Sequence, residues 1–153
     1  MPKNFKQREG AIIDRKRAHK EQKKEVKDFM TKKRDLVTFK KDTPIVEVVS
    51  NLLKNRITGG PVLDEKGAVV GLIDDKDCLK TVVDSIYHNH PVSQNTAEQY
   101  MTNVMRSVKP EMSIVDAANI FLSTPFKRLL VVDNSGGLVG QISRRDVLRA
   151  IQD

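Results

Sequence analysis

The sequence predicts an α/β (α+β) fold of two β-α-β-β-α units, preceded by an N-terminal charged helix. Three observations lead to this prediction: the chain repeats itself, each repeat alternates helical and strand-like apolar spacing, and the first residues are strongly charged. The chain has 153 residues, 39% of them hydrophobic. That is enough apolar material for the core of one domain or of two small ones.

The internal repeat is the strongest signal. Residues 36–80 align without a gap on residues 105–149, an offset of 69 positions, and 12 of the 45 pairs are identical. Upstream, Phe29-Met30-Thr31 resembles Tyr100-Met101-Thr102 at an offset of 71. A unit of about 60 residues is marginal alone. We therefore expect the two copies to pack about a pseudo-two-fold axis.

Each repeat predicts the same elements in the same order. In the first copy, Thr43 suits the N-cap and Pro44 the first helical position. Ser113 suits the N-cap in the second copy. The helices that follow carry apolar residues at helical spacing, which are Ile45, Val48, Val49, Leu52 and Leu53 in one copy and Ile114, Ala117, Ala118, Phe121 and Leu122 in the other.

A hairpin and a closing helix complete each repeat. Two short apolar runs joined by a glycine-containing turn predict the hairpin, over Pro61–Leu63 and Ala68–Ile73 in the first copy and Leu129–Val132 and Leu138–Ile142 in the second. Apolar residues at helical spacing predict the closing helices, which are Leu79, Val82, Val83 and Ile86, and then Val147, Leu148 and Ile151. Short edge strands are expected near Leu36–Phe39 and Ser107–Val108.

The N-terminal stretch holds most of the net charge of +7. Residues 1–28 contain ten Lys and Arg against five Asp and Glu, a net +5. The stretch Glu9–Met30 lacks proline and predicts a helix whose apolar end is Val26–Phe29. We therefore divide the chain into a basic helical arm (residues 1–24), a first unit (25–92) and a second unit (93–153). Such an arm can bind nucleic acid or an acidic partner, or it can remain a solvated helix.

Composition excludes several classes of protein. No apolar run approaches the roughly 20 residues that span a bilayer, and the N-terminus lacks the apolar region of a secretory signal. The single cysteine, Cys78, suits a reducing compartment, so we expect a cytoplasmic protein without membrane contact. His88 and His90 have no evident third ligand, so no metal site is expected. No catalytic motif is present, which predicts a protein that is not an enzyme.

The segment Ser143-Arg144-Arg145-Asp146 is the main candidate site. It lies where a strand is predicted to pass into a helix, so free N–H groups and the helix dipole favour an anion there. Arg144 and Arg145 add donors for phosphate. The Asp146 carboxylate can accept both hydroxyls of a ribose. The alternative is a local helix cap, in which Ser143 and Asp146 only satisfy the first helical turn.

The two repeats together resemble tandem CBS (cystathionine-β-synthase-type) domains. The resemblance rests on Gly140-x-x-Ser143-x-x-Asp146, on the strand Pro61-Val62-Leu63-Asp64, and on the Met-Thr dipeptides at residues 30–31 and 101–102. It covers residues from about 25 to 153. The resemblance implies an adenosine-type ligand (AMP, ADP or ATP, alone or with Mg²⁺) in a cleft between the units.

The resemblance also implies which residues line each cleft. Asp146 would bind the ribose, beside Ser143, Arg144 and Arg145, and main-chain groups of Lys127, Arg128 and Leu129 would frame the base. Thr102 and Arg106 would line the same cleft by family position.

The first repeat departs from the pattern because Asp74 replaces the Ser or Thr and Asp75 follows it. Three nearby carboxylates oppose a phosphate chain unless a cation screens them. We therefore expect a weaker second cleft at Asp77 and Asp74. The resemblance implies that Thr31, Thr58 and Gly59 line this cleft.

The sequence thus predicts a non-catalytic, energy-sensing regulatory module that binds an adenine nucleotide. The resemblance implies a homodimer, and an effector protein would read the bound state. The alternative is a protein that binds nucleic acid or a partner through its basic N-terminal helix, with the repeats serving as a dimerisation scaffold.

Overall fold

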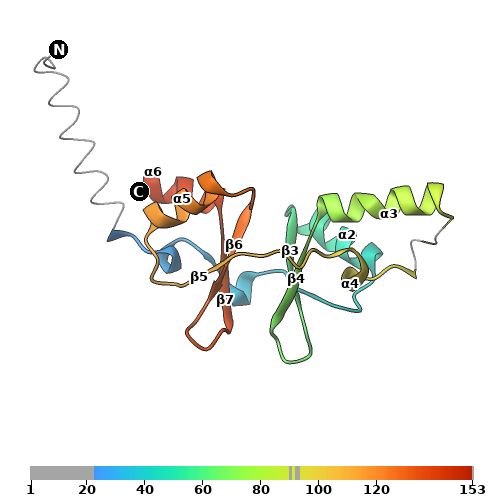
Figure 1. Ribbon diagram of the computed structural model, residues 1–153, viewed down its shortest axis with the longest axis horizontal. Helices are drawn as coiled ribbons and strands as arrows, with labels where there is room; N and C mark the ends of the chain where they lie inside the picture. Colours follow the sequence, from blue (N-terminus) through green and yellow to red (C-terminus); the bar gives the residue numbers. More distant parts are fainter. Residues whose placement is uncertain (1–22, 90, 92–93, 153) are drawn as a thin grey trace, which may run out of the picture. The chain divides into compact units, whose positions relative to one another are not determined.

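A computed structural model describes residues 23–89, 91 and 94–152 (Figure 1). The expected N-terminal helix falls largely on residues 1–22, outside the described residues. Where the described chain begins, the expectation of a helix up to Met30 is wrong. Residues 26–28 form the short 3-10 helix η1 (Val26–Asp28), and the strand β1 (Thr31–Lys32) follows.

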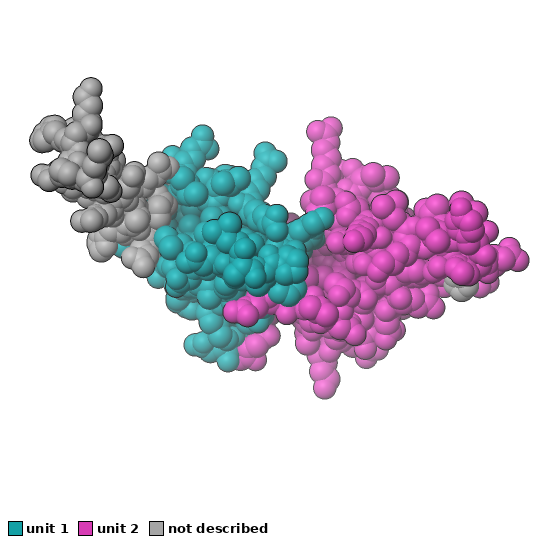
Figure 2. Space-filling view, turned by 45° about the horizontal axis from the view of Figure 1, so that its top comes forward, with its two compact units in different colours: residues 1–32, 107–134, 139–153 teal, residues 33–106, 135–138 magenta. Residues whose placement is uncertain are grey.

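The described residues form two compact units, drawn in different colours in Figure 2. Unit 2 comprises Lys33–Arg106 and Ser135–Leu138, and unit 1 comprises the chain up to Lys32 with residues 107–134 and 139–152. Unit 2 contains η2 (Lys33–Asp35), β2 (Phe39–Lys40), α2 (Ile45–Asn55), β3 (Gly59–Leu63), β4 (Val69–Asp74), α3 (Asp75–Tyr87) and α4 (Ala97–Tyr100). The second repeat supplies β5 (Ser107–Val108), α5 (Ile114–Ser123), β6 (Arg128–Val132), β7 (Leu138–Ser143) and α6 (Arg144–Gln152).

The predicted β-α-β-β-α order is confirmed in both repeats. One sheet has the strand order β2-β3-β4 and the other the order β1-β7-β6-β5. β2 runs parallel to β3, and β5 runs parallel to β6. The parallel neighbours are each joined by the helix of the repeat, α2 or α5. The predicted edge strand at Ser107–Val108 is confirmed, while the other begins at Phe39 and not at Leu36.

The start of each repeat packs on the body of the other repeat. We call residues 25–32 and 96–102 the opening segments. Thr31 of the first segment pairs with Gln141 of β7, and Thr102 of the second exchanges two main-chain hydrogen bonds with Leu72 of β4, at 2.8 and 2.9 Å. The compact units and the sequence repeats are therefore two different partitions of the chain.

The residue just before each opening segment binds the beginning of a repeat helix. The N–H of Ile45 donates to the carbonyl of Asn95 at 3.0 Å, and the N–H of Ile114 donates to the carbonyl of Lys24 at 2.9 Å. The predicted N-cap role of Thr43 is wrong, because its hydroxyl accepts from the N–H of Lys40 at 2.9 Å and α2 begins after Pro44. Ser113 does cap α5, accepting from Asp116.

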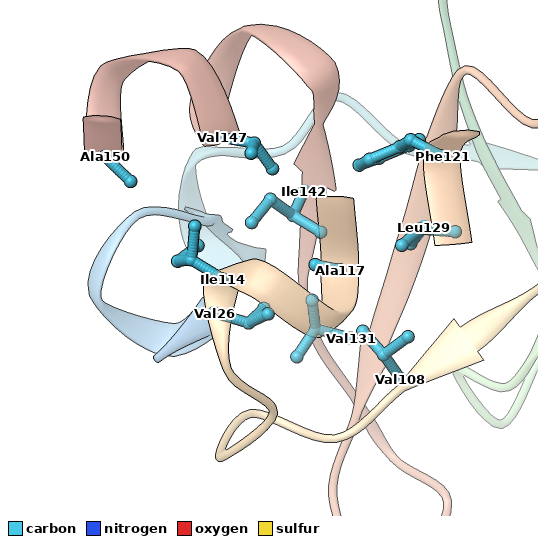
Figure 3. Packing of buried hydrophobic residues seen from close by; sticks show 10 residues of the cluster. All are labelled: Val26, Val108, Ile114, Ala117, Phe121, Leu129, Val131, Ile142, Val147 and Ala150. Atoms are coloured by element: carbon cyan, nitrogen blue, oxygen red, sulfur yellow. The ribbon is translucent and has the colours of Figure 1, made fainter. Parts of the chain in front are cut away.

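The core of unit 1 is completed by an opening segment. Val26 is fully buried among residues of α5, α6 and the strands (Figure 3), and the cluster consists of Val26, Val108, Ile114, Ala117, Phe121, Leu129, Val131, Ile142, Val147 and Ala150. Ala97 holds the same place in unit 2, where it is also fully buried. None of the helices in the described part of the chain has both the length and the apolar run needed to cross a bilayer.

The glycine that opens each Gly-x-x-x-x-x-Asp motif is required by this packing. A Cβ built on Gly140 would lie 2.6 Å from the carbonyl oxygen of Thr31. One built on Gly71 would lie 2.6 Å from Met101 Sδ and 3.0 Å from the carbonyl oxygen of Thr102. The motif glycine therefore leaves room for the opening segment on the neighbouring strand.

We predict that Gly140→Ala lowers the free energy of unfolding by about 1–3 kcal/mol, a typical cost of overpacking. Gly71→Ala should cost less, because its closest neighbour is a flexible methionine side chain, whereas the neighbour of Gly140 is main chain. Urea unfolding of the two variants measures the difference. Equal stability of the two variants would contradict this explanation of the motif.

Candidate functional site

The Asp146 carboxylate lies at the junction of β7 and α6, as predicted. The residue is 7% exposed. Its Oδ2 accepts the main-chain N–H of Ser143 at 2.8 Å and the Ser143 hydroxyl at 3.0 Å. The N–H of Asp146 points back to Ser143 Oγ at 3.3 Å. The capping arrangement is thus present, and it holds the carboxylate at the positive end of a nine-residue helix.

Arg149 is a member of this cluster that the sequence analysis missed. Its Nη2 lies 2.5 Å from Asp146 Oδ1 and 3.2 Å from the carbonyl oxygen of Phe29. The side chain of Arg149 is 57% exposed, whereas that of Asp146 is 10% exposed. The available signal was the spacing Asp-x-x-Lys/Arg, which both repeats share as Asp77–Lys80 and Asp146–Arg149.

The other residues predicted around Asp146 differ in how accessible they are. Arg144 and Arg145 are exposed, and Arg144 Nη2 donates to the carbonyl of Phe126 at 3.3 Å. Lys127 is exposed, and Arg128, which begins β6, is half-buried. Leu129 is fully buried in the core, so only its main chain is available to a ligand.

The equivalent junction in unit 2 is built from carboxylates. The N–H of Asp77 donates to Asp74 Oδ1 at 2.9 Å, and the N–H of Asp74 donates to Asp77 Oδ2 at 3.0 Å. Lys80 Nζ lies 3.6 Å from Asp77 Oδ1. Gly59 pairs with Asp74, and the carbonyl of the exposed Thr58 accepts the N–H of Asp75 at 2.8 Å. The structure thus brings Thr58 and Gly59 to the Asp74–Asp77 cluster.

Burial raises the pKa of the Asp77 carboxyl above its usual value. The negative charge of Asp74 acts in the same direction, while the ammonium of Lys80 opposes it. Burial, together with the same carboxylates, raises the pKa of the neighbouring Cys78 thiol to about 11. The thiol of Cys78, which is free and buried, is therefore protonated at neutral pH.

The threonines assigned by family position lie one in each unit. Thr31 lies in unit 1, with Asp146, and the exposed Thr102 and Arg106 lie in unit 2, with Asp77. The family resemblance implies that Thr31 lines the Asp77 cleft and that Thr102 and Arg106 line the Asp146 cleft. These assignments stay predictions. His88 ends α3 as its C-cap, and His90 lies outside the described residues.

We predict that Asp77→Asn changes how stability depends on pH. Because the folded-state pKa of Asp77 is raised, the folded protein holds this proton more tightly than the unfolded chain, and its contribution to stability falls as pH rises from about 4 through the folded pKa. Asparagine removes that loss and can still accept from the N–H of Asp74. Thermal unfolding of the wild type and the variant between pH 3.5 and 6.5 measures this difference in the pH dependence of stability. Parallel pH profiles for wild type and variant would show the prediction to be wrong.

The comparisons with known proteins place the chain in a family. The family model described as "CBS domain" matches residues 26–84 and 97–153. The chain is 36% identical over 148 residues to the CBS domain-containing protein CBSX1, chloroplastic, of Arabidopsis thaliana, covering 82% of this chain and 63% of that protein. The chain is also 29% identical over 157 residues to the uncharacterized protein MJ1426 of Methanocaldococcus jannaschii, covering 82% and 90% respectively.

Solved structures give the same result. A crystal structure of CBSX2, a protein of Arabidopsis thaliana, in complex with AMP has a TM-score of 0.74 and 31% identity, covering 84% of this chain and 96% of that one. The chain spans less than two thirds of the full CBSX1 and CBSX2 sequences, 63% and 62%. The two matched stretches, the β-α-β-β-α order found twice and these likenesses show that the chain belongs to the CBS domain family, as a tandem pair.

Proposed function

We propose that this chain is a non-catalytic regulatory module that binds an adenine nucleotide through the ribose at Asp146. The observation that carries the proposal is the AMP complex of CBSX2, a relative 31% identical over 96% of its resolved chain. The geometry at Asp146 is compatible with it, because a buried carboxylate is held at a strand-to-helix junction with two exposed arginines beside it.

The chemistry of the Asp146 cluster suits a nucleoside phosphate. A carboxylate that accepts hydrogen bonds from a vicinal diol selects a ribose. Arg144 and Arg145 offer charge-assisted donors for the phosphate, at the positive end of α6. Thr102, Arg106 and Lys127, with the main chain of Arg128 and Leu129, remain the proposed lining of the same site.

The Asp77 cluster is proposed as the weaker site, with Asp74, Thr31, Thr58 and Gly59. Asp74, Asp75 and Asp77 bring three carboxylates to one helix start. Lys80 is paired with Asp77 at 3.6 Å. A phosphate chain is repelled there unless Mg²⁺ accompanies it. A charged triphosphate should therefore depend on Mg²⁺ more strongly at this site than AMP does.

Regulation would follow from differential binding. A nucleotide that binds one arrangement of the protein better than another shifts the population toward it, and an effector protein reads the shift. Energy sensing is the proposed purpose, because AMP, ADP and ATP differ only in the phosphates that the arginines would meet. A reducing compartment such as the cytoplasm is the proposed location, since Cys78 is free and buried.

A homodimer is part of the proposal, and the helices of unit 2 present the surface for it. The residues that predicted α3 are exposed: Leu79 (64%), Val82 (51%), Val83 (50%) and Ile86 (70%). With Val46 and Leu53 of α2 they form what we call the apolar helix face, beside a groove of about 570 Å³ between α2 and α3. An exposed apolar surface of this kind marks an interaction site.

A second copy of the chain is the occupant we propose for the apolar helix face. Unit 1 repeats the pattern at equivalent positions, where Leu122, Leu148 and Ile151 are exposed. Self-complementary contacts of like surfaces are the rule in two-fold dimers. Each copy of the protein therefore carries the same type of apolar surface on both of its units. In a dimer, the apolar surfaces of one copy could pack against those of the other.

We predict that AMP at 100 times its dissociation constant stabilises the wild-type protein by about 2.7 kcal/mol. Asp146→Asn should weaken AMP binding at least tenfold, about 1.4 kcal/mol, because an amide no longer accepts both hydroxyls as a charged group does. Asp77→Asn, at the same position of the other repeat, is the matched control and should leave the stronger site unchanged. Because Asp146 also caps α6, affinity is measured by calorimetry well below the melting temperature.

A change in the ligand tests the same contact without altering the protein. 2′-Deoxy-AMP should bind the wild type about as weakly as AMP binds Asp146→Asn. Equal affinities for AMP and 2′-deoxy-AMP would contradict the ribose assignment. A protein that ignores nucleotides but binds RNA or DNA with a steep salt dependence, lost on removing residues 1–22, would favour the nucleic-acid alternative. The deletion should stop there because Val26 is part of the core.

We predict that Leu79→Glu converts a dimer into a monomer of 17.3 kDa. A charge on the apolar helix face would have to be buried unpaired in the interface, which is strongly unfavourable. Val104→Glu is the control, because Val104 is equally exposed (68%) but lies outside the helices. Light scattering after size-exclusion chromatography measures the mass. A monomeric wild type, or a dimeric Leu79→Glu, would overturn this part of the proposal.

A further inference from the structure

Arg149 uses part of the hydrogen-bonding capacity that a ribose would need at Asp146. Both oxygens of Asp146 are engaged, Oδ2 by the N–H and hydroxyl of Ser143 and Oδ1 by Arg149 Nη2 at 2.5 Å. A carboxylate has about four acceptor positions, so about one of those of Asp146 remains. A ribose diol that donates both of its hydroxyls needs two positions and must therefore replace one of these donors. The inference that follows rests on the proposed function, because it concerns the same carboxylate.

The donor that is easier to replace is Arg149. The Ser143 donors belong to the cap of α6, and losing them would leave the start of the helix unsatisfied. The guanidinium of Arg149 is on a side chain 57% exposed, so water can solvate it once it leaves. Oδ1 is accordingly the oxygen that a ribose hydroxyl would take.

The same nitrogen of Arg149 also binds the first opening segment. Nη2 donates to the carbonyl of Phe29 at 3.2 Å. The segment is held on unit 1 further by the N–H of Val26, which donates to the carbonyl of Met112 at 2.8 Å. Lys24, the residue just before the segment, donates through Nζ to the carbonyl of Ala150 at 2.5 Å. Arg149 thus links the candidate ribose carboxylate to the segment that directly follows the basic N-terminal stretch.

We infer that Arg149 is a competing internal ligand of Asp146, which a ribose displaces, and that its release loosens the opening segment at Phe29. Arg149 therefore lowers the affinity of the site and reports its occupancy to the N-terminal part of the chain. Occupancy of the site is passed on by an exchange of hydrogen-bond partners at one carboxylate.

Among the described residues of unit 2, no equivalent hydrogen bond joins Lys80 to the second opening segment, so this unit serves as the internal control. Lys80 holds the equivalent position, but its Nζ lies 3.6 Å from Asp77 Oδ1. The second opening segment is fastened to α3 by Tyr100, whose hydroxyl donates to Asp84 Oδ2 at 2.5 Å. That bond, the largest cause, raises the pKa of Tyr100 to about 12. The carboxylate that fastens this segment is a different one from Asp77.

The first experiment compares AMP affinity of the wild type, Arg149→Ala and Lys80→Ala by calorimetry. Arg149→Ala should bind AMP about two- to fivefold more tightly, the range expected for losing a competing exposed ion pair. Lys80→Ala should bind at the Asp146 site as the wild type does, and Arg149→Lys should fall between the wild type and Arg149→Ala. Arg149 is exposed, and the melting temperature of each ligand-free variant checks its folding.

The second experiment follows amide hydrogen exchange at Phe29 and Met30, whose N–H groups donate to the carbonyl of Val26. Saturating AMP should speed exchange there in the wild type by about two- to tenfold, the effect of losing one supporting hydrogen bond. In Arg149→Ala the free protein should already exchange at the faster rate, with no further change on adding AMP. Tyr100→Phe should leave this response intact.

The outcomes separate this inference from the proposed function. Weaker or unchanged AMP binding by Arg149→Ala overturns the inference while leaving nucleotide binding in place, and so does unchanged exchange at Phe29 and Met30 in AMP-bound wild type. Absence of AMP binding in both wild type and Arg149→Ala overturns the proposed function and the inference with it. Binding only in Arg149→Ala supports the inference in its strongest form.

Discussion

The main-chain pairing between each opening segment and the hairpin of the other repeat is the contact on which the rest of the structure depends. It adds Thr31 to the edge of β7 and Thr102 to the edge of β4. It also delivers a fully buried side chain, Val26 or Ala97, to each core. The motif positions require glycine because this pairing brings a main chain so close that a Cβ atom would collide with it. A sequence motif that reads as a ligand signature thus begins with a packing requirement.

The carboxylate of the aspartate that ends the motif caps a helix, and the same carboxylate is the proposed ligand of the ribose. In both repeats its carboxylate accepts the N–H of the residue three positions earlier, at 2.8 Å in one and 3.0 Å in the other. Unit 1 combines this with a serine and an arginine, and unit 2 with another aspartate and a lysine. The cap is common to both repeats, while the surrounding charge differs. The difference in proposed nucleotide affinity therefore arises from neighbours and not from the aspartate itself.

Much of the fold could be predicted because its signals are local. The order of elements, the strand at Ser107–Val108 and the cap at Ser113 follow from residue spacing within a few positions. The pairing of opening segments could not be predicted this way, since it depends on contacts such as Thr31 with Gln141, 110 positions apart. The prediction that Thr43 caps α2 was wrong for the same reason, because the main-chain carbonyl of Asn95 accepts the N–H of Ile45 at the start of the helix. Helical spacing predicted α3 correctly, yet the inward residues are Asp77, Cys78 and Thr81 and the apolar residues face outward.

The exchange of opening segments has a consequence for how the chain can be divided. A cut in the linker after Tyr87 would leave an N-terminal fragment that carries residues 25–32, which pack on β7, but lacks residues 96–102, which pack on β4. The C-terminal fragment would carry residues 96–102, which pack on β4 of the other fragment, but would lack residues 25–32, which pack on its own β7. Neither half contains a whole core, and each holds the piece that the other lacks. The two halves are thus suited to reconstitution by complementation, and we expect the pair, not the single repeat, to be the smallest unit that folds.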